Sequence, residues 1–261
     1  METVISRDGT PIAYERAGAG RPIIIATGIF NDHTRCAELA KELEVEHTVV
    51  TYDRRGRGQS GDTRPYAVER EVEDLDALIE LVGGSAAVVG YSSGGVVAWK
   101  AAADGSAITD LILFEPPIGF DPADRAPADL PGRIAALVEA GRPGDAVALA
   151  QIEGIGLPEQ MVAQLRESPM WPGLEAMAQS AVYDMTITTA VADVPAELTA
   201  VSTPTLILSG AQTWPKLSEA AHALAAATPA ATHREIVSGQ HHDIPPVETA
   251  QAVREFLARA R

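Results

Sequence analysis

The chain has 261 residues, of which 46% are hydrophobic, and this length suits one large domain with a substantial core. Its 20 basic and 36 acidic residues give a formal net charge of −16, which argues against nucleic acids and anionic membranes as partners. A single cysteine, Cys36, excludes an internal disulfide framework, and neither a signal peptide nor a bilayer-length apolar run is visible, so we expect a soluble cytoplasmic protein.

The first part of the chain predicts strands that alternate with helices. Two short strands at 3–6 and 12–15 flank a hairpin turn at 8–10. Continuous apolar runs at 22–26 and 48–52 are typical of strands covered on both faces. Helical spacing of apolar residues follows at 34–43 and 68–81. Another apolar strand at 86–89 leads into a glycine-rich turn and a helix, and the next strand spans 111–114.

The segment 119–195 has a different pattern. Prolines and glycines multiply, and the periodic stretches predict helices without a convincing strand, at 134–140, 146–152, 159–165 and 174–181. Strands return at 205–208 and 233–237, with helices at 217–227 and 247–260. Alternating strands and helices predict an α/β fold with a mostly parallel eight-stranded sheet flanked by helices. We therefore expect a core formed by 1–118 and 196–261 and a helical cap formed by 119–195.

The turn after the strand at 86–89 carries the pattern G-x-S-x-G, with Ser92 at its centre. A sharp strand-to-helix turn strains the backbone of such a serine, and the residues two positions away must be small because a Cβ would collide there. The turn raises the hydroxyl above the sheet, and the first amides of the helix face any developing negative charge. The pattern thus predicts a nucleophile, and the alternative is a serine that only caps the helix.

Taken together, these motifs resemble the α/β-hydrolase fold superfamily over nearly the whole chain. The likeness rests on the turn around Ser92, the polar turn at 52–58, the strand end at 27–28 and the late sequence at 239–242. The segments 113–117 and 168–173 are also similar to uncharacterised bacterial members, which implies no chemistry. The resemblance implies a serine hydrolase, in which the arginines of the polar turn pair with acids rather than bind phosphate.

The resemblance also implies a histidine base and an acid that orients it. The family histidine aligns with His242, and the adjacent His241 is the alternative. A carboxylate usually follows the strand at 205–208, but residues 209–215 contain no Asp or Glu. Some members place the acid after the preceding strand, where this chain has Glu115, and a carboxylate that ends a buried strand needs a partner. Asp243 and Asp184 are weaker candidates for the acid.

Backbone amides of Ser93 and Ile29 are the expected oxyanion-hole donors. The candidate substrate-binding residues are Phe30, Tyr91, Trp171 and Trp214. His33 is the other histidine expected near the pocket. No cofactor motif and no cluster with metal-ligand spacing is visible, so we expect neither a cofactor nor a metal.

The combined hypothesis is a serine hydrolase that cleaves a small-molecule carboxylic ester, lactone or thioester through an acyl-enzyme on Ser92. Two alternatives stay open because a fold does not determine a reaction. One is other chemistry at the same site, such as carbon–carbon bond hydrolysis, perhydrolysis or a biosynthetic cyclisation. The other is a non-catalytic member that binds a small ligand. The oligomeric state does not follow from these patterns.

Overall fold

The computed structural model describes residues 1–119 and 125–259. Its eight-stranded sheet has the order β1-β2-β4-β3-β5-β6-β7-β8. The strands are β1 (Glu2–Ile5), β2 (Pro11–Ala17), β3 (Arg21–Ala26), β4 (His47–Tyr52), β5 (Ala86–Tyr91), β6 (Ile108–Phe114), β7 (Thr205–Gln212) and β8 (Ala231–Gln240). The β1–β2 and β2–β4 pairs are antiparallel and the other neighbours are parallel. The predicted α/β fold with a mostly parallel sheet is confirmed.

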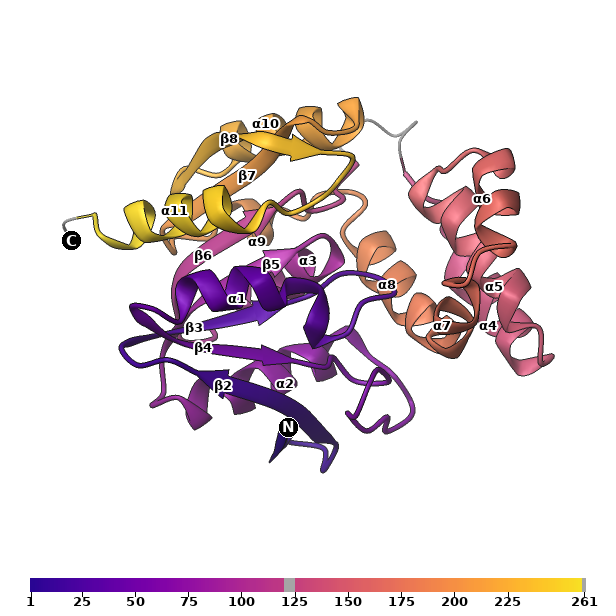
Figure 1. The fold of residues 1–261 in the computed structure, drawn as a ribbon, viewed down its shortest axis with the longest axis horizontal. Helices are drawn as coiled ribbons and strands as arrows, with labels where there is room; N and C mark the ends of the chain where they lie inside the picture. The colour runs from indigo at the N-terminus through magenta and orange to yellow at the C-terminus, as the bar shows by residue number, and fades with distance from the viewer. Residues whose placement is uncertain (120–124, 260–261) are drawn as a thin grey trace.

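Helices cover both faces of the sheet (Figure 1). One face carries a short 3-10 helix (His33–Cys36), α1 (Ala37–Leu43) and α11 (Pro246–Leu257). The opposite face carries α2 (Val68–Leu81), α3 (Ser93–Ala103), α9 (Ala196–Thr199) and α10 (Pro215–Ala227). Each face has its own cluster of buried apolar side chains, because every central strand is covered on both sides. Within the described ranges, no helix is long and apolar enough to cross a membrane.

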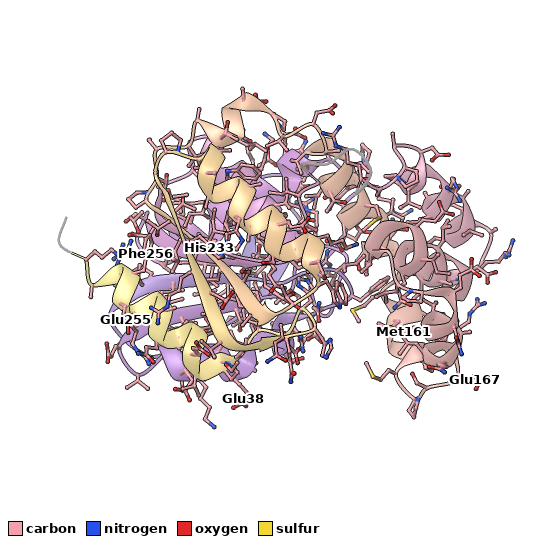
Figure 2. All side chains as sticks on the ribbon, turned by 90° about the horizontal axis from the view of Figure 1, so that it is seen from above. Glu38, Met161, Glu167, His233, Glu255 and Phe256 are labelled. Carbon is pink, nitrogen blue, oxygen red and sulfur yellow. The ribbon has the colours of Figure 1, made fainter. Side chains whose placement is uncertain are left out.

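Between β6 and β7, before α9, the chain forms the helices that we call the cap. They are α4 (Leu130–Glu139), α5 (Pro143–Leu149), a π-helix (Ala150–Ile155), α6 (Glu159–Arg166), α7 (Trp171–Ala176) and α8 (Ala178–Ala190). A third apolar cluster holds them together, so the cap has a core of its own. Figure 1 shows α4 to α7 as a lobe beside the sheet, and α8 lies between this lobe and the core. Figure 2 shows Met161 and Glu167 on this lobe, far from Glu255 and Phe256.

One predicted cap helix, at 174–181, is wrong in its bounds. The helix is interrupted at Met177, which separates α7 from α8, and α8 continues to Ala190. The threonines of this last part have low helix propensity, so the sequence pattern does not predict that the helix continues there. In the structure, the Thr186 and Thr189 hydroxyls donate to backbone carbonyls four residues earlier, so the helix continues through them.

The register of the parallel strands aligns their carboxyl ends at one edge. Tyr91, the last residue of β5, pairs with Phe114, the last residue of β6, and Phe114 pairs with Leu208 in β7. The residues that follow, Ser92 and Glu115, therefore leave the sheet at the same level. Ligands of open α/β sheets bind beyond this carboxyl edge.

Candidate active site

Ser92 occupies the turn between β5 and α3 in a strained backbone conformation. Its φ is 54° and its ψ is −129°, a region that residues with a side chain rarely adopt. A Cβ on Gly94 would lie 2.4 Å from the Ala26 carbonyl oxygen, and one on Gly90 would lie 2.4 Å from the Gly95 Cα. Only glycine fits at these two positions, as the motif predicts. Ser92 is 7% exposed and lines a cavity of about 500 Å³.

His242 follows β8, and its ring contacts Glu115. The His242 Nδ1 atom lies 2.5 Å from the Glu115 Oε2 atom. The other carboxylate oxygen of Glu115 accepts a hydrogen bond of 2.7 Å from the Gly210 amide, and the side chain is fully buried. A carboxylate at Nδ1 favours the tautomer with the proton there, which leaves Nε2 as a proton acceptor. Glu115 and His242 also have positive φ values, 46° and 63°, and such strain clusters at functional sites.

Two aromatic side chains contact His242. The Tyr91 ring stacks on the imidazole at a centroid distance of 5.1 Å, and the Trp214 ring lies 5.7 Å away. The Tyr91 hydroxyl also donates a 2.6 Å hydrogen bond to the His242 carbonyl oxygen. These contacts hold the histidine loop against the carboxyl edge of the sheet.

Ser92 and His242 both line the cavity, but no hydrogen bond joins their side chains among the described residues. Hydrogen bonds between catalytic groups are often long before substrate binds and shorten in the complex. The arrangement therefore places a hydroxyl and a carboxylate-bound imidazole on one cavity without a direct bond between them.

The other acid and base candidates lie elsewhere. His241 is exposed, and Asp243 forms a 2.5 Å ion pair with Arg35. Asp184 is bound to two buried arginines. Thr213 lies in the segment 209–215, where the resemblance leads one to expect the acid. Its buried hydroxyl has no partner among the described residues. Within the described part of the chain, Glu115 is the only one of the three candidate acids with a hydrogen bond to the His242 ring.

The two expected oxyanion-hole residues, Ile29 and Ser93, also line the cavity. Ser93 is the first residue of α3, so its amide has no acceptor within the helix. The loop that bears Ile29 packs directly on the turn that bears Ser92, because a Cβ on Gly28 would lie 2.7 Å from the Ser92 Cβ. Arg57 Nη1 donates a 2.7 Å hydrogen bond to the Gly28 carbonyl oxygen and fixes this loop.

Arg54, Arg57, Glu71 and Asp184 form a group of ion pairs that we call the buried arginine cluster. Arg54 lies 2.8 Å from both Glu71 and Asp184, and Arg57 lies 2.7 Å from Asp184. All four side chains are at most 2% exposed. Asp184 also accepts a 2.6 Å hydrogen bond from the Ser93 hydroxyl. The cluster thus ties cap helix α8 to the turn that bears Ser92.

The charges of the cluster alter the protonation of Asp184. Burial raises the pKa of this carboxyl, but the guanidinium groups of Arg57 and Arg54 lower the pKa by a larger amount. The pKa of Asp184 therefore lies below the ordinary value. Arg55, in the same turn, pairs with Asp8 at 2.9 Å and Asp74 at 2.7 Å. The structural role expected for the arginines of the polar turn is confirmed.

The walls of the cavity are mainly apolar. Three of the four candidate substrate-binding residues, Phe30, Tyr91 and Trp214, line it. Trp171 does not. Its indole is buried in the cap, where Nε1 donates a 2.9 Å hydrogen bond to Glu175. The cap contributes the apolar side chains Leu157, Leu165, Met170, Leu174 and Met185 to the lining.

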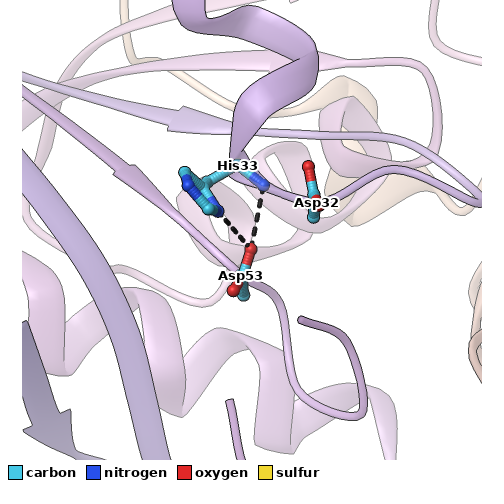
Figure 3. A group of neighbouring side chains, drawn as sticks. All are labelled: Asp32, His33 and Asp53. Carbon is cyan, nitrogen blue, oxygen red and sulfur yellow. Dashed lines mark hydrogen bonds and ion pairs between the residues drawn. The ribbon is translucent and has the colours of Figure 1, made fainter. Parts of the chain in front are cut away.

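One group of side chains could hold a cation by distance alone. The ligand atoms of Asp32, His33 and Asp53 all lie within 4.8 Å of one another (Figure 3). Asp53 Oδ1 accepts hydrogen bonds from the His33 amide and ring, at 2.9 and 2.7 Å, and Oδ2 accepts one from the Gln59 amide. Asp32 Oδ1 accepts hydrogen bonds from Thr34. These hydrogen bonds give the group a structural role, in which it holds neighbouring loops together. His33 is not among the described cavity-lining residues.

The model of the alpha/beta hydrolase family matches residues 24–256. An alpha/beta hydrolase from Sphaerobacter thermophilus DSM 20745 is 42% identical, with a TM-score of 0.91, over 98% of this chain and 100% of that one. A thermophilic esterase from Thermogutta terrifontis is 25% identical, with a TM-score of 0.74, over 98% of this chain and 97% of that one. The uncharacterized hydrolase YraK of Bacillus subtilis (strain 168) is 34% identical over 93 residues, or 34% of each chain. The matches to curated relatives thus span about a third of their length.

Proposed function

Because the chain belongs to the alpha/beta hydrolase family, we propose that it is a serine hydrolase that cleaves a carboxylic ester, lactone or thioester of a small molecule. One observation carries the proposal: His242 and Ser92 line the same cavity, and the His242 ring is bound through Nδ1 to the buried Glu115 behind it. The likeness to the Thermogutta terrifontis esterase supports an ester-type bond.

In the proposed reaction, the Ser92 hydroxyl attacks the substrate carbonyl carbon while His242 Nε2 takes its proton. Glu115 orients the ring and stabilises the imidazolium that forms. The Ser93 and Ile29 amides donate hydrogen bonds to the oxyanion, and each such donor is worth about 2.7–4 kcal/mol in comparable sites. His242 then protonates the departing alcohol or thiol. Water, deprotonated by His242, attacks the acyl-enzyme and releases the acid and the Ser92 hydroxyl.

Labelling with a fluorophosphonate and turnover of short alkyl esters test this proposal. We expect an adduct on Ser92 that is absent in Ser92→Ala, together with a fall in kcat of about 10⁴-fold or more in that variant. Glu115→Gln should lower kcat by about 10³- to 10⁴-fold, because the ring loses the charge that stabilises imidazolium. Glu255→Gln, which removes an exposed ion pair with Arg234, is the control and should retain activity, because neither residue is among the described cavity-lining residues. A folded wild-type protein that forms no adduct would contradict the proposal.

A further inference from the structure

Gln151 places a buried acceptor on the cavity wall without a partner. Gln151 is one of the residues that line the cavity and is 4% exposed, but its Oε1 atom is shielded from water and no described residue donates a hydrogen bond to it. An unpaired buried acceptor typically costs about 1–3 kcal/mol of stability. Most buried polar groups of native proteins have a partner, so this one requires an explanation.

Other polar side chains of the cavity wall are already bonded. The Asn31 amide donates to the Ile29 carbonyl oxygen at 2.6 Å, and the Thr188 hydroxyl donates to the Asp184 carbonyl oxygen at 3.0 Å. Arg125 donates to the Gly119 carbonyl oxygen at 3.0 Å and pairs with Asp193. Gln151 differs from these side chains because its acceptor is buried and unpaired.

The backbone around Gln151 is held in place. Gln151 belongs to the π-helix Ala150–Ile155, a rare form that occurs frequently at functional sites. The π-helix packs tightly on α8, since a Cβ on Gly154 would lie 2.4 Å from the Met185 sulfur. Its end is fixed by the Leu157 amide, which donates to the Gln151 carbonyl oxygen at 2.9 Å. Because the backbone is fixed, only the side chain of Gln151 has to adjust when a ligand arrives.

We propose that Gln151 is a specificity-determining residue whose side-chain amide turns towards the cavity, where Oε1 accepts a hydrogen bond from a hydroxyl or N–H group of the substrate. The inference rests on the proposed hydrolase function and narrows its substrate class to esters, lactones or thioesters that carry such a donor on an otherwise apolar group. The apolar side chains around the cavity, such as Leu157 and Leu174, suit the rest of that group. Sites that bond a substrate hydroxyl discriminate strongly against the analogue without it.

Matched pairs of esters test the inference with the full-length protein. In one series, methyl esters of unbranched acids are compared with their ω-hydroxy counterparts over a range of chain lengths. In the other, the hydroxyl is on the alcohol, as in alkyl and hydroxyalkyl acetates. Acid release is titrated. We expect kcat/KM of the best hydroxylated ester to exceed that of its plain partner by about tenfold or more.

Two variants test whether Gln151 causes the preference for the hydroxylated ester. Gln151→Leu, similar in size but apolar, should bring the ratio for the same pair within about twofold while plain-ester turnover persists. Gln164→Leu, on the exposed face of α6, is the matched control and should leave the ratio unchanged. Turnover without a hydroxyl preference in either series, or an unchanged ratio in Gln151→Leu, overturns this inference alone. Absence of turnover on every ester, with no adduct on Ser92, overturns the proposed function as well.

Discussion

The buried arginine cluster beside the Ser92 turn and the single buried side chain of Gln151 on the cavity wall differ in how fully their hydrogen bonds are satisfied. In the buried arginine cluster, every carboxylate oxygen of Glu71 and Asp184 accepts at least one hydrogen bond. Arg57 Nε is the one side-chain atom of the cluster without a partner among the described residues. On the cavity wall, Gln151 Oε1 is equally inaccessible and has none.

This difference separates polar groups that support the structure from those available to a ligand. The ions of the cluster hold α8 and the loop at Gly28 against the Ser92 turn, and their charges are used within the protein. The Gln151 acceptor contributes nothing comparable, so its burial lowers stability and only a binding partner can offset that cost. Substitutions in the two regions should therefore change stability in opposite directions.

The largest effect is expected for Asp184→Ala. The substitution leaves Arg54 and Arg57 with fewer counter-charges in a buried site, and breaking such a pair typically costs about 3–5 kcal/mol of unfolding free energy. Urea denaturation followed by circular dichroism measures the loss. Glu153→Gln, which removes the exposed ion pair with Arg133, is the control and should leave the midpoint unchanged. Equal midpoints for the two variants would rule out the stabilising role of the cluster.

A smaller effect is expected in acid. The pKa of Asp184 in the folded protein lies below its ordinary value of 3.8, so the folded state binds fewer protons at this site than the unfolded state. The stability from this carboxylate is present above that ordinary value and is lost as the pH falls through the folded pKa. Between about pH 5 and about pH 3, Asp184→Asn should therefore lose less unfolding free energy than the wild type. Parallel losses in urea titrations at both pH values would contradict the prediction.

The smallest effect, with the opposite sign, is expected for Gln151→Leu. Replacing an unpaired buried amide by an apolar group of similar size should raise the unfolding free energy by about 1 kcal/mol. The same urea experiment measures it, with Gln164→Leu as the exposed control. A clear loss of stability would mean that the amide has a structural role, and the contrast between the two regions would disappear.

The parts of the site that local geometry dictates could be predicted from the sequence. Glycines two positions either side of Ser92 indicate that neighbouring backbone passes too close for a Cβ, and the structure shows those contacts. Glu115 was predicted as the acid because it follows a buried strand and no carboxylate follows the next one. The structure brings Glu115 to His242, while the catalytic roles of these residues stay predictions.

The parts that depend on packing between distant segments could not be predicted. Asp184 and Arg54 are 130 positions apart, and the sequence suggested Asp184 only as a weak candidate for the catalytic acid. The periodicity predicts a helix at 146–152, but not that its end is a π-helix that carries Gln151. Trp171 was expected to line the pocket beneath the cap, but in the structure its indole packs within the cap.

The position of Asp184 on α8 has a consequence for how a substrate enters. A rigid swing of the whole cap would pull this carboxylate away from Arg54 and Arg57 and leave two cations stranded in a dry interior. Helix α8 is therefore the fixed edge of the cap, and any opening movement that keeps these ion pairs has to come from α4 to α7, which carry none of them. Such a movement would leave the turn that bears Ser92 anchored, because Asp184 stays bonded to the Ser93 hydroxyl.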